Sequence, residues 1–177
     1  MHRIVVFCGA ATGVDPKWSI MAADVGRTLA ARGIGIVYGG GHVGLMGIVA
    51  DAAMKAGGEV IGVIPRFMEK AEEAHKGVTE LILVETMHER KQRMFELCDA
   101  VLALPGGFGT LDELFELLTW KQIGLHTRPI GLLNAHGFYD ALIAHMDHMR
   151  REGFLHGDTA VIVEQDVARL ADRLLPG

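Results

Sequence analysis

Three glycines near the middle of the chain, Gly106, Gly107 and Gly109, have a spacing that suits anion binding. They lie between an apolar run at residues 100–104, which predicts a strand, and a run with helical periodicity at residues 111–120. Glycines without side chains let a ligand approach the backbone, and the following helix points its free N–H groups and its positive dipole end at the same place. Such a turn most often binds phosphate.

The four residues after these glycines, Thr110 to Glu113, allow two interpretations. The pattern Thr-x-x-Glu is a capping box, in which Thr110 is the N-cap and Glu113 bonds back to the N-cap amide. A cap, however, does not need the Pro-Gly-Gly-x-Gly sequence that precedes it. Asp112 and Glu113 also bring two negative charges to the expected phosphate loop, which is unfavourable unless a carboxylate faces another part of the ligand. Glu113 is therefore a candidate for activating water or contacting a sugar.

Two cations, Arg90 and Lys91, lie near the start of the preceding helical segment, residues 87–98. At i+3 and i+4 from Met87 they share its apolar stripe, whereas a solvated charge run would lie on the opposite face. The chain has a formal net charge of -5. Inward-facing cations in such a chain indicate either an anionic ligand or an ion pair with Glu113 or another carboxylate.

Strand and helix patterns alternate along all 177 residues, and the strands are continuously apolar. This is typical of a parallel sheet covered by helices on both faces. We predict one Rossmann-like α/β domain over residues 1–177, with a three-layer, doubly wound parallel sheet, and a mobile flap or short helix at 66–76. The expected strands are 4–8, 34–38, 60–64, 81–84, 100–104, 129–133 and 161–163, and the expected helices are 19–32, one ending near 56, 87–98, 111–120, 138–152 and 167–175.

Two further glycine-rich turns follow strands, at Gly9 and at residues 39–47. Ligands of doubly wound sheets bind beyond the carboxyl ends of the strands, so we expect the three turns to line one crevice. The second turn matches G-x-G-x-x-G by letter, but the next strand ends at residues 63–66 without the acid that holds a dinucleotide ribose. It is either a tight turn for close helix–strand packing or a backbone wall for a mononucleotide, and the second interpretation fits better.

The composition excludes several classes of function. The net charge argues against a general nucleic-acid surface, no apolar run approaches the length of a membrane span, and the apolar stretch at the start is too short for a signal peptide. Cys8 and Cys98 lie in apolar runs, as buried free thiols of a reducing compartment do, so we expect a cytoplasmic protein. His145 and His148 have a spacing that suits a metal, but no third ligand is evident, and we expect no metal site.

The segment from Pro105 to Glu113 resembles the PGGxGTxxE signature of the LOG ("Lonely Guy") family, whose members are cytokinin-activating phosphoribohydrolases. The resemblance covers nearly the whole chain and keeps the family's order of motifs. The other segments that carry it are 7–9, 37–41, 44–47, 60–65, 87–91 and 120–126.

This resemblance implies a Rossmann-like homodimer that hydrolyses the N-glycosidic bond of N6-substituted adenosine 5′-monophosphates, giving the free base and ribose 5-phosphate without a metal or organic cofactor. By position, Arg90 and Glu113 match the family's catalytic pair. Ala10 and Ala11 stand where relatives often carry serines, which could remove a hydroxyl contact with the substrate. The expected substrate contacts are Gly9, Gly40, Gly41, Met46, Glu72, Met87, Arg90, Lys91, Gly107, Phe108, Gly109, Thr110, Leu111, Asp112, Glu113 and Thr119.

Members of this family are often labelled lysine decarboxylases, but the sequence shows no obvious pyridoxal-phosphate site. Two rival functions remain. One is a broader nucleosidase that acts on AMP or other 5′-monophosphates. The other is a non-catalytic nucleotide or cofactor carrier, similar to molybdenum-cofactor carrier proteins. The presence of both Arg90 and Glu113 argues against a carrier, because a carrier needs the phosphate cradle but not the acid.

Overall fold

The computed structural model describes residues 1–70 and 73–176. Within these residues, seven parallel strands form one sheet in the order β4-β3-β2-β1-β5-β6-β7. The strands are β1 (Arg3–Phe7), β2 (Gly35–Tyr38), β3 (Val60–Pro65), β4 (Glu80–Val84), β5 (Ala100–Ala103), β6 (Ile130–Leu133) and β7 (Ile162–Glu164).

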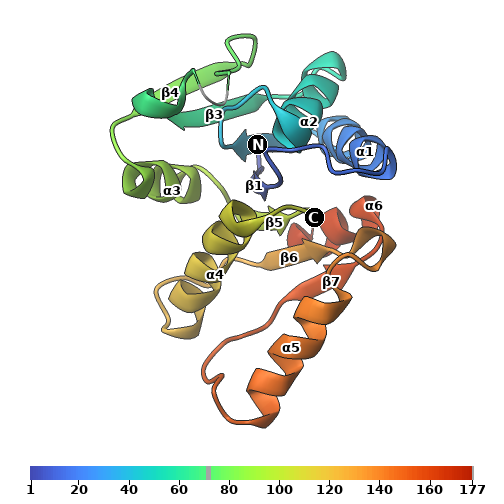
Figure 1. Cartoon of the computed structure of the whole chain (residues 1–177), viewed down its shortest axis with the longest axis vertical. Coiled ribbons are helices and arrows are strands. Elements are labelled where there is room, and N and C mark those ends of the chain that lie inside the picture. Colours follow the sequence, from blue (N-terminus) through green and yellow to red (C-terminus); the bar gives the residue numbers. More distant parts are fainter. Residues whose placement is uncertain (71–72, 177) are drawn as a thin grey trace.

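Helices cover both faces of this sheet (Figure 1). Successive strand residues point to opposite faces, so Ile4 and Val6 of β1 join one hydrophobic core while Val5 and Phe7 join the other. The first core is closed by α1 (Lys17–Ala31), α2 (Gly44–Lys55) and α6 (Val167–Leu174), and the second by α3 (Met87–Glu96), α4 (Phe108–Gln122) and α5 (Asp140–Arg151). The predicted three-layer, doubly wound fold is confirmed.

The strand order reverses between β1 and β5, which pair along Ile4–Phe7 and Ala100–Ala103. The chain first adds β2, β3 and β4 on one side of β1, and then returns to add β5, β6 and β7 on the other. A crevice forms beyond the carboxyl ends of two strands at such a switch point, because their connections leave in opposite directions. The turns after Phe7 and after Ala103 are therefore neighbours in space.

Between β3 and β4, the segment expected to be a flap or short helix begins with a single 3-10 turn, η1 (Arg66–Met68). It returns to the body at Ala74, which forms an antiparallel bridge with Gly41 in the turn after β2. A second 3-10 turn, η2 (Ala135–Gly137), connects β6 to α5. None of the described helices is both long enough and apolar enough to cross a membrane.

Candidate active site

The glycine-rich turns meet at the switch point of the sheet. The Gly9 N–H donates to the Pro105 carbonyl oxygen at 3.2 Å, and the Leu45 N–H at the start of α2 donates to the Gly9 carbonyl oxygen at 3.0 Å. The turn after β1 is thus bonded to the turn after β5 and to the N-terminus of α2. The predicted common crevice is confirmed, with the second turn contributing through Leu45 and Met46 rather than through its glycines.

A cavity of about 580 Å³ opens at this junction. Its volume is in the range of small-molecule sites, roughly 300–1,000 Å³. It is lined by Cys8, Gly9, Ala10, Ala11, Thr12, Gly13, Trp18, Leu45, Met46, Met68, Met87, Arg90, Pro105, Gly106, Gly107, Gly109, Thr110, Asp112, Glu113 and Phe138.

The N-terminus of α4 forms one wall of the cavity. The helix begins at Phe108 with Gly107 as its N-cap, and none of the described side chains caps it. The interpretation of Thr110 as the N-cap is therefore wrong. Thr110 is the third helical residue and is only 3% exposed. Its hydroxyl packs against Gly106, only 2.0 Å from the position that a Cβ on Gly106 would occupy. The first N–H groups of an α-helix have no intrahelical acceptor, and Gly107, Gly109 and Thr110 at this end of α4 line the cavity.

Two glycines of this loop leave room for a ligand. A Cβ added to Gly107 or Gly109 would meet no other heavy atom within 4 Å, whereas one added to Gly106 would collide with Thr110. Gly106 is thus required by the packing of the loop itself. Gly107 and Gly109 instead keep the backbone amides open at the mouth of the cavity, as an anion site requires.

Arg90 is buried at the base of the cavity, with 4% of its surface exposed. Its Nε donates to the Val63 carbonyl oxygen at 3.1 Å and its Nη2 to the Gly39 carbonyl oxygen at 2.6 Å. Its Nη1 lies 3.8 Å from the Met68 sulfur and 3.9 Å from the Met87 sulfur. The guanidinium is therefore held by the carboxyl ends of β2 and β3, and its predicted inward orientation is confirmed.

Lys91, the next residue on α3, points to a neighbouring part of the surface. Its Nζ lies 2.7 Å from a carboxylate oxygen of Glu116 and 3.2 Å from one of Asp112. Partial burial lowers the pKa of Lys91, but the hydrogen bonds that Lys91 donates to Glu116 and Asp112 outweigh this effect and raise the pKa. For Lys91 the structure therefore shows the ion pair that the sequence left open as an alternative.

Glu113 is half-buried in the cavity wall, one turn into α4. Its charge acts on the thiol of Cys8, at the end of β1: burial first, and then the negative charge of Glu113, raise the pKa of Cys8. Cys8 is consequently a neutral thiol at pH 7 and is not an activated nucleophile. The cavity is thus lined by ionisable groups of opposite charge: the carboxylates of Asp112 and Glu113 on α4, and the buried guanidinium of Arg90 on α3.

The other predicted substrate contacts divide into three groups. Gly9, Met46 and Met87 line the cavity with Arg90, Gly107, Gly109, Thr110, Asp112 and Glu113. Lys91, Phe108, Leu111 and Thr119 instead line a shallow hollow on the outer side of α4, which Asp112 shares. Gly40 and Gly41 are buried beneath the turn after β2, and Glu72 lies outside the described residues.

The glycines after β2 are explained by packing. A Cβ on Gly39 would lie 2.2 Å from Arg90 Nη2, one on Gly44 would lie 2.2 Å from the Ala10 carbonyl carbon, and one on Gly47 would lie 2.0 Å from the His42 oxygen. The structure thus supports the interpretation of residues 39–47 as a tight turn for close helix–strand packing. It does not support their interpretation as a backbone wall for a mononucleotide.

Among the cavity residues that the sequence analysis did not identify, three lie outside the glycine-rich turns and the predicted strands. Trp18 and Phe138 come from α1 and from the connection before α5, and their rings pack edge to face at 5.4 Å, while Met68 comes from η1. No local pattern marks them, because none of the three belongs to one of the three glycine-rich turns. They add apolar surface to the lining of the cavity.

A parallel sheet with a ligand-sized cavity at its switch point, beside an uncapped helix N-terminus, defines the class of Rossmann-like α/β proteins. Solved structures agree. The molybdenum cofactor binding protein of Rippkaea orientalis superposes with a TM-score of 0.73 at 21% identity, covering 98% of this chain and 95% of that one. The molybdenum-cofactor carrier protein of Chlamydomonas reinhardtii gives 0.72 at 23% identity, covering 98% and 96%. At such identities the likeness concerns the fold alone.

Sequence comparison is more specific. The profile of a family described as "Possible lysine decarboxylase" matches residues 46–174. A cytokinin riboside 5′-monophosphate phosphoribohydrolase of Rhodococcoides fascians is 47% identical over 167 residues, which are 93% of this chain and 84% of that protein. The rice enzyme LOG is 45% identical over 169 residues, which are 95% of this chain and 70% of the relative. The chain belongs to this family, the LOG family that its motifs indicate.

Proposed function

We propose that residues 1–177 form a single catalytic domain that hydrolyses the N-glycosidic bond of N6-substituted adenosine 5′-monophosphates. The products are the free base and ribose 5-phosphate. The names of the relatives that are 45–47% identical over most of the chain support this activity, since all are cytokinin riboside 5′-monophosphate phosphoribohydrolases. The observation that carries the proposal is that Arg90, Glu113 and the uncapped N-terminus of α4 line one cavity.

In this scheme the α4 N-terminus binds the 5′-phosphate. The backbone N–H groups of Phe108, Gly109 and Thr110 are the free donors of the first turn, and the open space at Gly107 and Gly109 lets phosphate oxygens reach them. Binding of the phosphate, which does not react, then positions the ribose over the rest of the cavity. Gly9, Met46 and Met87 contribute to the walls around the sugar and base.

Hydrolysis breaks the C1′–N9 bond and forms a bond from C1′ to a water oxygen. Positive charge develops on the ribose ring in the transition state, as in other glycosyl transfers. The Glu113 carboxylate, one turn past the phosphate loop, stabilises that charge and accepts a proton from the attacking water. The leaving base takes up a proton from solvent at nitrogen, and Glu113 then returns its proton to solvent. The cation of Arg90 balances the negative charge that develops on the leaving base. Neither a metal nor an organic cofactor takes part in this scheme.

The apolar part of the cavity lining suits the base and its N6 substituent. Trp18, Phe138 and Met68 offer aromatic and thioether surface, which packs well against a purine and an aliphatic group. Ala10 and Ala11 keep this wall apolar where the family often has serines. An N6-isopentenyl group buried there gains roughly 25 cal/mol for each Å² removed from water.

We further propose that the protein is a cytoplasmic homodimer that pairs through the outer side of α4. Phe108 is 93% exposed there, beside the hollow lined by Leu111, Phe115 and Trp120. Contiguous apolar surface of this kind is typical of a protein–protein interface.

Light scattering tests the proposed dimer, because it gives the mass of the protein in solution. A dimeric wild type that becomes monomeric in Phe115→Asp is the expected result, and a wild-type monomer contradicts it.

One assay tests the activity against its rivals. AMP, its N6-isopentenyl form and IMP are incubated separately with the purified protein, and ribose 5-phosphate is measured enzymatically. The proposal expects the N6-isopentenyl nucleotide to have the highest kcat/KM. Equal kcat/KM for AMP indicates the broader nucleosidase. Tight nucleotide binding by calorimetry with no release from any substrate indicates a carrier and refutes the hydrolase.

A further inference from the structure

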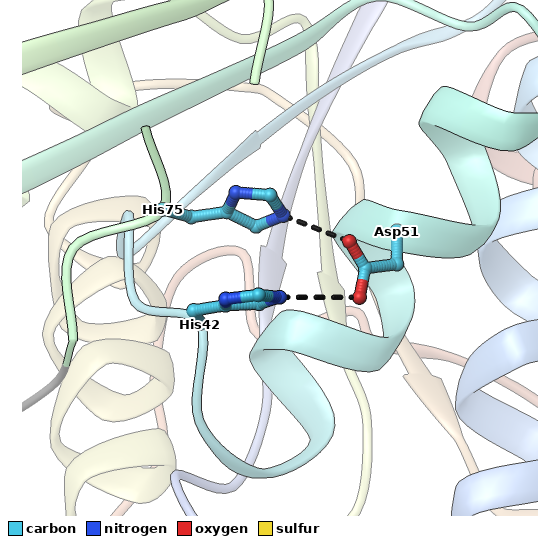
Figure 2. Close-up of side chains that lie close together, drawn as sticks. All are labelled: His42, Asp51 and His75. Atoms are coloured by element: carbon cyan, nitrogen blue, oxygen red, sulfur yellow. Dashed lines mark hydrogen bonds and ion pairs between the residues drawn. The ribbon is translucent and has the colours of Figure 1, made fainter. Parts of the chain in front are cut away.

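Two histidines and an aspartate come together on the side of the molecule where the turn after β2 meets the segment after η1 (Figure 2). His75 Nε2 lies 2.9 Å from Asp51 Oδ1, and His42 Nε2 lies 3.3 Å from Asp51 Oδ2. One potential ligand atom from each of the three residues lies within 4.8 Å of the others. The two imidazole rings stack with their centroids 4.1 Å apart, so both present a nitrogen to the same carboxylate.

The backbone fixes this arrangement before any ligand arrives. The His42 N–H donates to the Glu73 carbonyl oxygen, and the His75 N–H to the Gly40 carbonyl oxygen, both at 2.9 Å. These bonds flank the Gly41–Ala74 bridge and set the two histidines side by side, while Asp51 projects from the middle of α2. Side chains whose backbone is already held in place by hydrogen bonds lose little entropy on binding an ion.

We propose that His42, Asp51 and His75 form a binding site for a divalent transition-metal ion, with Zn²⁺ as the best match. Two imidazole nitrogens and one carboxylate oxygen suit Zn²⁺, Co²⁺, Ni²⁺ and Cu²⁺ better than Mg²⁺ or Ca²⁺. Around tetrahedral Zn²⁺ with bonds of 2.0–2.2 Å, ligand atoms stand about 3.4 Å apart, close to the two nitrogen–carboxylate distances here. The fourth position faces solvent and takes water.

Metal binding requires two small adjustments. The Gly77 N–H donates to His75 Nδ1 at 3.2 Å, which places the proton of the metal-free ring on Nε2. The metal displaces that proton, and Nδ1 then becomes protonated as the exposed turn at Gly77 moves away. The His42 side chain, 48% exposed, is free to rotate until its Nε2 lone pair converges with that of His75. The proton thus moves within the His75 ring and is not released. These adjustments weaken binding, so we expect micromolar rather than tighter affinity.

The site is separate from the catalytic cavity, because none of its three residues lines that cavity. Its position gives the ion a structural role: it ties the segment that follows Met68, a cavity residue, to the turn after β2 and to α2. Spacing along the chain does not reveal this group, since residues 42, 51 and 75 follow no common helical or loop motif.

The experiment uses the full chain with any affinity tag removed and bound metals stripped with a chelator. Isothermal calorimetry with ZnCl₂, run in two buffers of different ionisation enthalpy, measures affinity, stoichiometry and the number of protons exchanged with solvent. CoCl₂ provides a visible absorption spectrum that reports coordination number. One equivalent of Zn²⁺ at micromolar affinity, with no large proton release and a tetrahedral Co²⁺ spectrum, is expected.

Three variants make the result specific. Asp51→Asn and His42→Asn alter side chains that are about half exposed, so both should fold, and melting curves without metal verify this. Each should weaken Zn²⁺ binding by at least about tenfold. Removing a residue that only hydrogen-bonds to a metal ligand already lowers metal affinity by about that factor. The control, His145→Asn with His148→Asn, removes the exposed pair on α5 and should bind normally. The proposed site is overturned if the wild type does not bind Zn²⁺ with micromolar affinity. It is also overturned if binding survives in both site variants, or if only the control variant loses it.

Discussion

The guanidinium of Arg90 occupies the space that a side chain on Gly39 would need. Its Nη2 donates to the Gly39 carbonyl oxygen at 2.6 Å, and a Cβ on Gly39 would lie only 2.2 Å from the same nitrogen. The first glycine after β2 is therefore coupled to a cation on α3, although 51 positions separate them along the chain. The position of Arg90 in the cavity can be perturbed without altering Arg90 itself.

Gly39→Ala should displace Arg90 and reduce kcat/KM. Because the neighbouring atoms are buried, we expect a loss of about 1–3 kcal/mol in the free energy of unfolding, as for other overpacked sites. Denaturant unfolding and the ribose 5-phosphate assay measure the two effects. Wild-type kcat/KM in this variant would show that the reaction tolerates a displaced Arg90.

Arg90→Ala should impair both nucleotide binding and turnover. The substitution also leaves the carbonyl oxygens of Val63 and Gly39 without a buried donor, at a cost of about 1–3 kcal/mol each. Unfolding in urea separates lost stability from lost catalysis at temperatures where the variant is folded. An unchanged rate would restrict Arg90 to a structural role.

Glu113→Gln keeps the shape of the side chain and removes its charge. Turnover should fall by about 10²–10⁴-fold, the usual contribution of a general base, while nucleotide binding by calorimetry largely persists. Glu96→Gln, on the exposed face of α3, is the matched control and should leave both unchanged. Turnover by Glu113→Gln near the wild-type rate would refute the role of Glu113.

Gly109→Ala separates folding from ligand binding. The added Cβ meets nothing within 4 Å in the free protein, and alanine is favoured over glycine inside a helix, so stability should rise by about 0.5–1 kcal/mol. A bound phosphate would lie close to that Cβ, so KM should increase. Thermal melting and steady-state kinetics provide the two readouts, and an unchanged KM would place the phosphate elsewhere.

Cys8 should be unreactive despite lining the cavity. Burial and the charge of Glu113 raise its pKa, so the thiolate forms only in solutions more alkaline than an ordinary cysteine requires. Alkylation by iodoacetamide, followed by mass spectrometry, should be slow at pH 8 and accelerate above it. Cys98, whose pKa burial raises to about 11, serves as an internal comparison. Cys8→Ala should retain turnover, and its loss would assign the thiol a direct role.

The fold was predictable because continuously apolar strands and amphipathic helices are local signals. The first and last residues of the helices and strands were harder to predict. The pattern Thr-x-x-Glu predicts a helix start at Thr110, whereas α4 starts at Phe108. The helix starts earlier because the Thr110 hydroxyl packs over Gly106, beside Gly9. This contact depends on the tertiary fold, so local helix propensities do not predict it.

The candidate site was predictable where one segment carries several of its residues. Residues 105–113 contain a glycine turn and an acid in a fixed order, and the inward orientation of Arg90 follows from helical periodicity. Trp18 and Phe138 were not predictable, because only the return of α1 and the β6–α5 connection to the switch point brings them together. The outward direction of Lys91 depends likewise on the carboxylate of Glu116, one helix away.

The hydrogen bond from Gly9 to Pro105 has a consequence for biosynthesis. It joins a turn that leaves the ribosome early to one that emerges only after more than half of the chain has been made. A nascent chain that ends before α4 has no complete cavity, however well its first strands pair. Nucleotide can therefore stabilise this protein only late in translation, and the growing chain must reach that point without help from its ligand.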